Sequence, residues 1–511
     1  MPSYYLTTPI YYVNDKPHIG HAYTTLACDV LARFKRLDGF DVKFLTGTDE
    51  HGQKVEKSAS ERGIDPQIFT DEVSQNFRDL TGQLNFSNTD FIRTTENRHK
   101  QTCQLVWKQM LDAGHIYLDK YAGWYAVRDE AYYAENEIVD GKAPTGAPVE
   151  WVEEPSYFFR LSAFQDRLLA LYENNPDFVG PSSRLNEVKS FVKSGLRDLS
   201  VSRTSFSWGI PVPDDEKHVM YVWLDALTNY ITAVGYGKDN PDFEQFWPAD
   251  LHMVGKDILR FHAIYWPAFL MAVDAPLPKR VYAHGWWTNE GQKISKSLGN
   301  VIDPVALAET YGLDQMRYFL MREVPFGNDG DFSHQAMVHR MNGDLANDLG
   351  NLCQRVLSMV FKNCDAALPR RPDQLLDPDH TILNGAYALL EKNRRFHDSQ
   401  QFHEALKSIW DIIGDANRYV DEMAPWTLRK TDPARMADVL WVLCEVIRVV
   451  ALLIQPYMPQ SMGRLLDMLG IATDKRNFDQ ITSDASLGGG QSIDKPEPVF
   501  PRFIDAEKEA E

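Results

Sequence analysis

The chain has 511 residues, of which 72 are acidic and 53 are lysine or arginine, so its formal net charge at pH 7 is −19. With 44% hydrophobic and 24% charged residues, the composition is that of a globular protein and excludes a disordered or fibrous one. This length predicts about three or four domains. The most apolar stretch, 442–454, contains Glu445 and Arg448, which predicts a buried amphipathic helix and no membrane span.

The N-terminus has neither a basic leading segment nor a small-residue cleavage site, so we expect it to begin a mature domain. The five cysteines are an odd number and never form a CxxC pair, which argues against a disulfide framework and against a local zinc knuckle. We therefore expect a cytoplasmic protein without a membrane partner. The acidic balance still allows a locally basic groove that binds RNA.

In chain order, the first stretch predicts a strand at 3–10, a helix at 21–37 and a second strand at 41–46. Such a βαβ unit implies a parallel sheet with a right-handed crossover. Ligands bind these sheets at the carboxyl ends of the strands. The polar segments 12–21 and 46–53 are therefore expected at the ligand-binding edge.

From about residue 116 to 212 aromatic residues become dense, and a turn region rich in glycine and proline follows at 141–148, which predicts an inserted α+β domain. The α/β pattern returns with strands expected at 218–225 and 251–254 and a helix at 258–271. Beyond about residue 331 the periodicity is helical up to about residue 470, which predicts a helix bundle.

Two histidines stand at the start of the predicted first helix, in Pro17-His18-Ile19-Gly20-His21. Their spacing places both imidazoles on one face of the first turn, where backbone N–H groups favour phosphate. The intervening glycine would let a ligand approach the backbone closely. Taken alone, the segment fits a proline-capped helix start with two surface histidines better than a catalytic site.

A cationic loop follows much later in the chain, as Gly291-Gln292-Lys293-Ile294-Ser295-Lys296-Ser297-Leu298-Gly299-Asn300. Two lysines, separated by hydroxyl side chains and bounded by glycines, suit the developing charge of a polyphosphate. Taken alone, the same segment fits a solvated basic loop equally well.

Together, in this order and on an α/β sheet, the two segments resemble the HIGH and KMSKS motifs of class I aminoacyl-tRNA synthetases. Four further segments resemble methionyl-tRNA synthetases: TGTDEHG at 46–52, YVWLDA at 221–226, GKDI at 255–258 and APW at 424–426. The similarity extends from about residue 3 to the tail at 500–502, which is almost the whole chain.

The resemblance implies an α/β fold, with a Rossmann-type parallel-sheet catalytic domain, an inserted α+β connective domain and an all-α helix-bundle anticodon-binding domain. The expected boundaries are 1–115 and 218–285 for the catalytic domain, 116–217 for the insert, 286–340 for a stem-contact region with the KMSKS loop, 341–475 for the anticodon-binding domain and 476–511 for a tail on the surface.

The resemblance also implies the reaction of a methionine–tRNA ligase. Methionine and ATP would form methionyl-adenylate and pyrophosphate, and the methionyl group would pass to the 3′-terminal ribose of tRNA, at its 2′ hydroxyl. The expected partners are L-methionine, ATP with Mg²⁺, and the initiator and elongator methionine tRNAs, with no role for DNA.

The site residues are carried over position by position from the family's motifs. The expected catalytic residues are His18, His21, Lys293 and Lys296, and the same four would bind ATP together with Gly20, Gly255 and Asp257. The expected methionine pocket consists of Ile10, Tyr12, Asp49, Trp223, Ala226, Leu227, Tyr230, Ile258, His262 and Trp266. The expected readers of the CAU anticodon are Asn351, Arg355 and Trp426.

In this pocket, Asp49 would hold the substrate ammonium and the aromatic rings would surround the thioether. Leu227 departs from relatives that carry proline there. Without the resemblance, simpler roles fit most of these residues better: core packing for the pocket aromatics and for Trp426, and helix capping for Asn351. For Asp257, helix capping fits equally well.

Many methionyl-tRNA synthetases carry a zinc knuckle built on CxxC in the insert. In this chain the matching stretch is 125–130, with Ala126 and Asp129 in place of the cysteines, and 141–144 also lacks cysteine. Thiolate zinc sites need those ligands, so we expect no structural zinc and an insert stabilised by its own aromatic packing.

Three alternatives stay open. A class I synthetase for leucine, isoleucine or valine would carry a larger editing insert, and the cysteine enzyme needs zinc-bound thiolates. A smaller nucleotidyltransferase would not need a helical domain with Arg355 and Trp426. An inactive tRNA-binding relative would be expected to lose His18, His21 or Lys296. Because the chain ends soon after the bundle, we expect a monomer.

Overall fold

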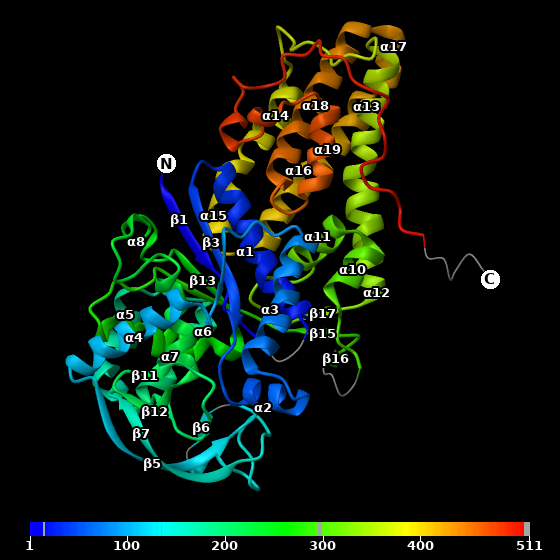
Figure 1. Cartoon of the computed structure of the whole chain (residues 1–511). Helices are drawn as coiled ribbons and strands as arrows, with labels where there is room; N and C mark the ends of the chain where they lie inside the picture. Colours follow the sequence, from blue (N-terminus) through cyan, green and yellow to red (C-terminus); the bar gives the residue numbers. More distant parts are fainter. Residues whose placement is uncertain (14–15, 130, 134, 295–298, 505–511) are drawn as a thin grey trace. The chain divides into compact units, whose positions relative to one another are not determined.

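A computed structural model describes residues 1–13, 16–129, 131–133, 135–294 and 299–504 (Figure 1). The chain divides into two compact units, one formed by 3–28 and 42–284 and the other by 1–2, 29–41 and 285–511. We call the first the sheet unit and the second the helical unit. Each unit is described by itself.

The sheet unit is built on a seven-stranded sheet with the strand order β2-β3-β1-β13-β14-β8, in which β4 also pairs with β3. The strands are β1 (Ser3–Thr7), β2 (Tyr11–Tyr12), β3 (Asp41–Asp49), β4 (Asp90–Arg93), β8 (Val179–Gly180), β13 (Leu251–Gly255) and β14 (Val281–His284). β2 and β4 both pair with β3 in parallel, and β13 pairs in parallel with β1 and with β14. The predicted parallel sheet is therefore confirmed.

Helices flank this sheet: α1 (Ile19–Leu37), α2 (Gln53–Arg62), α3 (Pro66–Gln83), α4 (Asn97–Asp112), α5 (Gln165–Asn174), α6 (Ser182–Lys193), α7 (Val222–Thr232), α8 (Pro241–Phe246) and α9 (Trp266–Ala272). The predicted first helix is confirmed and begins two residues earlier than expected, at Ile19.

Two predicted elements of the sheet unit differ from the structure. The strand expected at 218–225 is wrong in its second half, because β12 (Asp215–Met220) ends early and α7 begins at Val222. A buried apolar run has no periodicity that separates a strand from a helix. The helix expected at 258–271 is divided into a 3-10 turn (Lys256–Ile258), a π-helical turn (Phe261–Tyr265) and α9.

The region after Ile116 adds antiparallel strands. A four-stranded sheet has the order β6-β5-β7-β9, with β5 (Ile116–Ala126), β6 (Ala131–Tyr133), β7 (Glu150–Phe159) and β9 (Leu199–Ser200). A three-stranded sheet joins β10 (Ser202–Arg203), β12 and β11 (Pro211–Val212). 3-10 turns lie at Glu135–Glu137 and Leu161–Phe164. These strands, with α5 and α6, have the mixed character that the sequence predicts.

The helical unit contains the predicted bundle. Its helices are α10 (Pro304–Tyr311), α11 (Leu313–Arg322), α12 (His334–Arg340), α13 (Asn351–Asn363), α14 (Asp377–Tyr387), α15 (Leu389–Asp398), α16 (Phe402–Met423), α17 (Pro425–Thr431), α18 (Pro433–Ile454) and α19 (Pro459–Met468). A π-helical stretch (Met341–Gly350) joins α12 to α13, and 3-10 turns lie at Thr473–Lys475 and Phe478–Gln480. A small sheet pairs β15 (Trp287–Asn289) with β16 (Gln292–Lys293) and β17 (Gly330–Phe332).

The apolar run at 442–454 lies in α18, and its two charged residues are buried as a pair, with Arg448 2.6 Å from Glu445. Within the residues that the structure describes, no helix is long and apolar enough to cross a membrane. The expectation of a buried helix in this stretch is thus confirmed.

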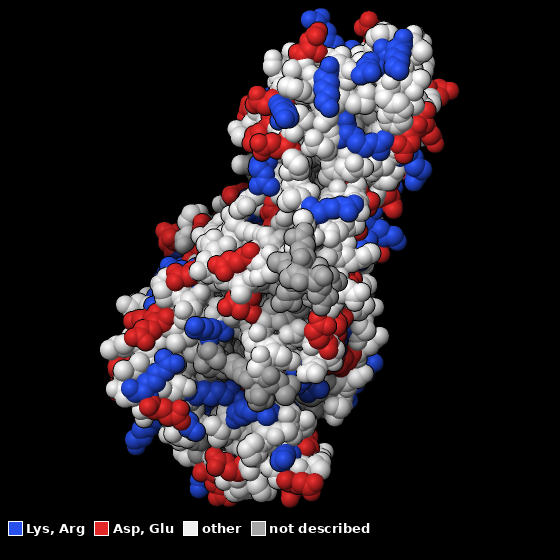
Figure 2. All heavy atoms as spheres, turned by 90° about the vertical axis from the view of Figure 1, so that its right-hand side faces the viewer, with Lys and Arg blue, Asp and Glu red and all other residues white. Residues whose placement is uncertain are grey.

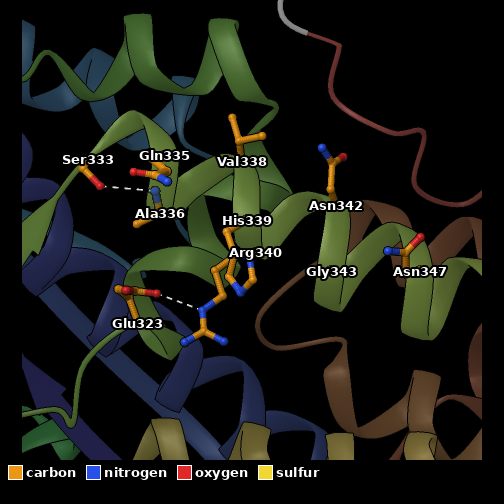
Figure 3. Close-up of a pocket in the computed structure, with 10 residues that line it drawn as sticks. All are labelled: Glu323, Ser333, Gln335, Ala336, Val338, His339, Arg340, Asn342, Gly343 and Asn347. Atoms are coloured by element: carbon orange, nitrogen blue, oxygen red, sulfur yellow. Dashed lines mark hydrogen bonds and ion pairs between the residues drawn. The ribbon is translucent and has the colours of Figure 1, made fainter.

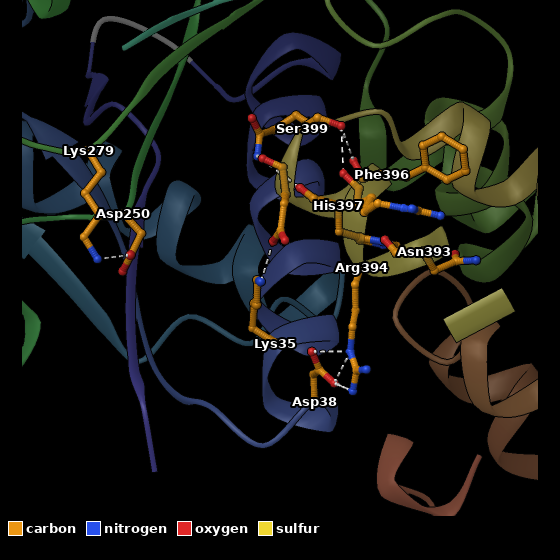
Figure 4. A network of polar contacts seen from close by, with 12 residues as sticks. Lys35, Asp38, Asp250, Lys279, Asn393, Arg394, Phe396, His397 and Ser399 are labelled. Atoms are coloured by element: carbon orange, nitrogen blue, oxygen red, sulfur yellow. Dashed lines mark hydrogen bonds and ion pairs between the residues drawn. The ribbon is translucent and has the colours of Figure 1, made fainter. Parts of the chain in front are cut away.

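The second half of α1 packs within the helical unit (Figure 4). Phe34 stacks on His397 with ring centres 3.7 Å apart, and Lys35 is paired with Asp398 at 2.6 Å. About one helical turn later, the Asp38 carboxylate accepts three hydrogen bonds from the Arg394 guanidinium. Side-chain charges therefore fix the end of α1 that lies farthest from the histidine motif.

Candidate functional site

The two histidines of the first motif lie ring against ring, with centres 3.9 Å apart. The backbone N–H of His18 donates to Nδ1 of His21, and the backbone N–H of Gly20 donates to Nδ1 of His18. The donor–acceptor distance is 3.1 Å in both bonds. A backbone N–H can only donate, so each Nδ1 accepts and the proton of a neutral ring lies on Nε2. In this tautomer each ring carries its N–H on Nε2, a type of donor from which an anion can accept a hydrogen bond.

The structure gives a further reason for glycine at position 20, beside the close approach of a ligand that the sequence predicts. A Cβ atom built there would lie 2.9 Å from Cε1 of His18. The space beside this glycine is thus filled by the neighbouring imidazole, and a larger residue would displace the His18 ring.

The residues expected to bind methionine all belong to the sheet unit. Ile10 lies between β1 and β2, Tyr12 ends β2 and Asp49 ends β3. The others lie on α7 or between Ile258 and Trp266. Ala226, Leu227, Tyr230, His262, Trp266 and Asp49 are buried, whereas Ile10, Tyr12, Trp223 and Ile258 are partly buried.

Direct contacts join four of these residues. The Tyr230 hydroxyl lies 2.7 Å from Nε2 of His262, whose Nδ1 lies 2.9 Å from the carbonyl oxygen of Ile258. The carbonyl can only accept, so Nδ1 of His262 carries the proton and Nε2 accepts from Tyr230. The rings of Tyr230 and Trp266 meet edge to face at 5.9 Å. Burial lowers the pKa of His262 to about 4, which keeps the ring neutral near pH 7.

Sequence reasoning missed Phe261 and His252 at this place. Phe261 stacks on Trp223 with ring centres 3.7 Å apart. His252 stacks on Tyr230 at 4.1 Å. The position of Phe261, three residues after the GKDI segment, could have pointed to it, but nothing local in the sequence links His252 to α7.

A buried carboxylate connects two of the sequence motifs. Asp225, in YVWLDA, is fully buried and lies 2.6 Å from Nδ1 of His51, in TGTDEHG. Its other oxygen lies 2.7 Å from Nε2 of His99 on α4. Burial alone would raise the pKa of Asp225, but the charges and hydrogen bonds of His51 and His99 outweigh it and lower the pKa to about 2. The carboxylate therefore anchors the helix that carries the pocket residues.

We expect Asp225→Asn to lower the stability of the folded protein above about pH 4. The pKa of Asp225 is lower when folded (about 2) than when unfolded (about 3.9), so its stabilising effect is complete above about pH 4 and is lost between about pH 4 and pH 2. A shift of this size corresponds to about 2–3 kcal/mol. Melting temperatures of wild type and Asp225→Asn would be measured at several pH values. The difference between the two melting temperatures should narrow below about pH 4, and a difference independent of pH would contradict the assignment. Asp112→Asn, at an exposed carboxylate on α4, is the control.

Among the described residues, His99, Cys103 and Asp225 form a buried group whose ligand atoms lie within 4.8 Å of one another. These atoms contact each other directly, with Sγ of Cys103 3.2 Å from Nε2 of His99. All five cysteines lie in described residues, and none is in a disulfide.

The cationic loop begins in the β15–β16 hairpin, where Lys293 is exposed and its ammonium lies 5.8 Å from the centre of the Trp286 ring. Gly291 and Gly299 both have a positive φ, +74° and +67°, a left-handed backbone that favours glycine. Lys296, the other predicted catalytic lysine, lies outside the described residues.

The residues expected at the ATP ribose lie just after β13. Gly255 precedes the 3-10 turn, and a Cβ atom there would lie 2.5 Å from Oδ1 of Asp257. Asp257 is exposed and lies within the turn, whose capping position belongs to Gly255. The capping role that the sequence left open for Asp257 is therefore wrong.

The three residues expected to read the anticodon share one region of the helical unit. The Arg355 guanidinium lies 5.6 Å from the Trp426 ring centre and donates to Asp421 over 2.7 Å. Trp426, at the start of α17, is 45% exposed, so it is not a core residue. Asn351 is exposed at the junction with the preceding π-helical stretch, where it occupies the C-terminal cap position of that stretch, so the capping role stays open. A pocket of about 150 Å³ is lined by Arg355, Trp426 and apolar residues of α13, α16 and α18.

A larger pocket of about 700 Å³ lies around α12 and the following π-helical stretch (Figure 3). Arg340 lines it and is paired with Glu323 at 2.8 Å. Its lining includes none of the site residues expected from the sequence. Figure 2 shows basic and acidic side chains interspersed on one face of the molecule, so the net negative charge does not prevent local basic groups.

The class of protein follows from three features of the fold taken together. These are the parallel sheet with paired histidines at its first helix, the antiparallel insert, and the helical bundle with an exposed arginine–tryptophan pair. Their combination is that of a class I aminoacyl-tRNA synthetase. The family described as "tRNA synthetases class I (M)" matches residues 4–148 and 143–357. The family described as "Anticodon binding domain of methionyl tRNA ligase" matches residues 376–511. The chain belongs to the methionyl-tRNA synthetase family, as its sequence motifs indicate.

Relatives and solved structures agree with this assignment. A methionine–tRNA ligase from Rickettsia conorii is 57% identical over 504 residues, covering 98% of this chain and 99% of the relative. One from Brucella suis is 57% identical over 511 residues, with 99% of each chain covered. The structure of Mycobacterium tuberculosis methionyl-tRNA synthetase in complex with methionyl-adenylate has a TM-score of 0.95 and 52% identity, covering 98% of this chain and 100% of that one. The chain is accordingly a methionine–tRNA ligase, and the three alternative classes are set aside.

Proposed function

We propose that the site residues named from the sequence perform the two steps of this ligase reaction. The observation that carries the proposal is the histidine pair, because backbone N–H groups occupy both Nδ1 atoms and leave both Nε2 atoms as donors. Two such donors at the start of a helix suit the phosphates of ATP. His18, Gly20, His21, Gly255, Asp257, Lys293 and Lys296 would bind the nucleotide.

In the first step, a carboxylate oxygen of methionine attacks the α-phosphorus of ATP in line. The new O–P bond forms as the bond to pyrophosphate breaks, and the pyrophosphate leaves with its electron pair. No protein nucleophile is needed, so the enzyme acts by positioning and by stabilising charge. His21, Lys293 and Lys296, supported by His18, would stabilise the charge on the phosphates. Mg²⁺ would enter with ATP, whose phosphate oxygens are its preferred ligands, and neutralise part of their charge.

In the second step, the terminal ribose hydroxyl of tRNA attacks the methionyl carbonyl and AMP leaves. The pocket of Ile10, Tyr12, Asp49, Trp223, Ala226, Leu227, Tyr230, Ile258, His262 and Trp266 would hold methionine, with Asp49 facing the ammonium. The exposed Trp426 and the adjacent Arg355, with Asn351, would hold unstacked anticodon bases by stacking and by hydrogen bonds.

The insert is proposed to be metal-free. Asp129 stands where the family's zinc knuckle has cysteine, and its carboxylate already accepts hydrogen bonds from the hydroxyls of Tyr133 and Thr145 and from Arg128. The rings of Trp124 and Trp151 pack edge to face at 5.4 Å. A carboxylate engaged by three donors, without a thiolate beside it, does not fit a zinc site.

The remaining parts of the proposal follow the expectations from sequence. The catalytic domain would consist of 1–115 and 218–285, and the inserted connective domain of 116–217. The stem-contact region would be 286–340, the anticodon-binding domain 341–475 and the surface tail 476–511. The protein would act as a cytoplasmic monomer on both initiator and elongator methionine tRNAs. The five cysteines outside disulfides are consistent with a reducing compartment.

ATP–pyrophosphate exchange with each of the twenty amino acids tests the proposal, using protein before and after treatment with a chelator. We expect exchange with methionine only, undiminished after zinc removal when Mg²⁺ is resupplied, and metal analysis of the untreated protein without stoichiometric zinc. Exchange with another amino acid would overturn the pocket assignment. Activity lost with zinc and restored by it would overturn the metal-free insert.

A further inference from the structure

His252 is the second residue of β13 and is fully buried. In the parallel register of β1 with β13 it is directly opposite Thr7. It belongs to none of the motifs in the sequence, yet its ring contacts two of the expected pocket residues, Tyr230 and Trp266.

Hydrogen bonds fix the tautomer of His252. The indole N–H of Trp266 donates to Nε2 of His252 over 3.3 Å, and an indole nitrogen can only donate. Nε2 is therefore the acceptor, so the proton of the neutral ring lies on Nδ1 and donates to Oγ1 of Thr7 over 2.8 Å. Burial, reinforced by nearby His262, lowers the pKa of His252 well below its usual value, which keeps the ring neutral.

The same ring supports Tyr230 from its face. The two rings are stacked, with centres 4.1 Å apart and planes inclined by 30°. Other contacts hold the two ends of Tyr230: its hydroxyl lies 2.7 Å from His262, and its carbonyl oxygen accepts from the Tyr5 hydroxyl over 2.8 Å. His252 thus joins the side chains of both Tyr230 and Trp266 to the central strands of the sheet, in addition to the backbone contact that Tyr5 makes with Tyr230.

We propose that His252 is a positioning residue that fixes Tyr230 and Trp266 and thereby determines which amino-acid side chains the pocket accepts. The inference rests on the proposed methionine pocket and adds to it a residue that lies behind the pocket residues Tyr230 and Trp266. Substrate would contact the two aromatic side chains, and His252 would act only through them. A side chain that differs from methionine in shape, such as leucine, would gain most if the two rings became mobile, since a rigid apolar pocket discriminates by fit.

The decisive variant is His252→Phe, which keeps a flat ring against Tyr230 and removes both hydrogen bonds. The Trp266 N–H and the Thr7 hydroxyl would then lose their partner in a buried place. In pyrophosphate exchange we expect the KM for methionine to rise about tenfold while kcat and the KM for ATP change by less than about twofold. We also expect the preference for methionine over leucine, measured as a ratio of kcat/KM values, to fall about tenfold.

A conservative variant and a matched control complete the test. His252→Gln supplies one acceptor and one donor, so it should restore most of the selectivity. Thr7→Val removes the partner of Nδ1 without changing a pocket residue and should raise the KM for methionine by about threefold. Thr70→Val, at an equally buried threonine on α3, is the control and should leave the constants unchanged.

The outcomes separate this inference from the proposed function. Wild-type exchange with methionine supports the function, and its absence would overturn the function itself. If wild type exchanges methionine but His252→Phe keeps its KM and selectivity, the inference on His252 is overturned and the function stands. If His252→Phe lowers kcat by the same factor for every amino acid, the inference on His252 is likewise overturned, because general damage to the enzyme does not change its selectivity. If His252→Phe does not fold, the Thr7→Val result decides.

Discussion

Trp426→Leu is expected to reduce tRNA charging strongly and to leave methionine activation unchanged. The indole is 45% exposed beside Arg355, in a unit that does not contain the methionine pocket. Stacking of one base on an aromatic side chain contributes about 1–3 kcal/mol, so kcat/KM for tRNA should fall about 5- to 150-fold. Aminoacylation with methionine tRNA and pyrophosphate exchange without tRNA would be measured on the same preparation.

The matched control is Trp426→Phe, which keeps an aromatic face and should retain most of the charging activity. A tryptophan that served only as core packing would behave differently. In that case both variants would lower the melting temperature, and exchange would fall together with charging. Equal charging by Trp426→Leu and wild type would contradict the role in anticodon binding.

His21→Asn is expected to slow adenylate formation by about 10²- to 10³-fold, the usual cost of losing one donor to transition-state charge. In the wild type the backbone N–H of His18 donates to Nδ1 of His21. The side-chain oxygen of asparagine can accept the same hydrogen bond, so the start of the helix should be preserved. The Nε2 donor is lost. Because His21 lies outside the methionine pocket, the KM for methionine should change by less than about threefold.

Pyrophosphate exchange at varied methionine and ATP concentrations would measure both constants. His380→Asn, at an exposed histidine of α14, is the control for this substitution and should leave the rate unchanged. A His21→Asn protein with wild-type kcat and a raised KM for methionine would contradict the assignment of His21 to the phosphates.

Much of the fold was predictable because local patterns determine it. The strand predicted at 3–10 and observed as β1 (Ser3–Thr7), the helix predicted at 21–37 and observed from Ile19, and the helical bundle follow from hydrophobic periodicity and from capping residues, which act over one or two turns. The second half of the segment at 218–225 was predicted wrongly for the same reason. Residues 222–225 are apolar or buried whether they form a strand or a helix, so only the packing of α7 decides between them.

For the candidate site as well, some features follow from the sequence and others only from the packed chain. The sequence by itself determined the chemistry: which imidazoles, lysines and aromatic residues are present, in motifs short enough to identify the family. It could not determine contacts between distant segments, because each contact depends on how the sheet and helices pack. Asp225 meets His51 across 174 residues of chain, and His252 lies opposite Thr7 across 245. The tertiary structure alone decided that Asp225 anchors α7, that His252 supports Tyr230 and Trp266, and that Trp426 is exposed, since burial and long-range hydrogen bonds are properties of the packed chain.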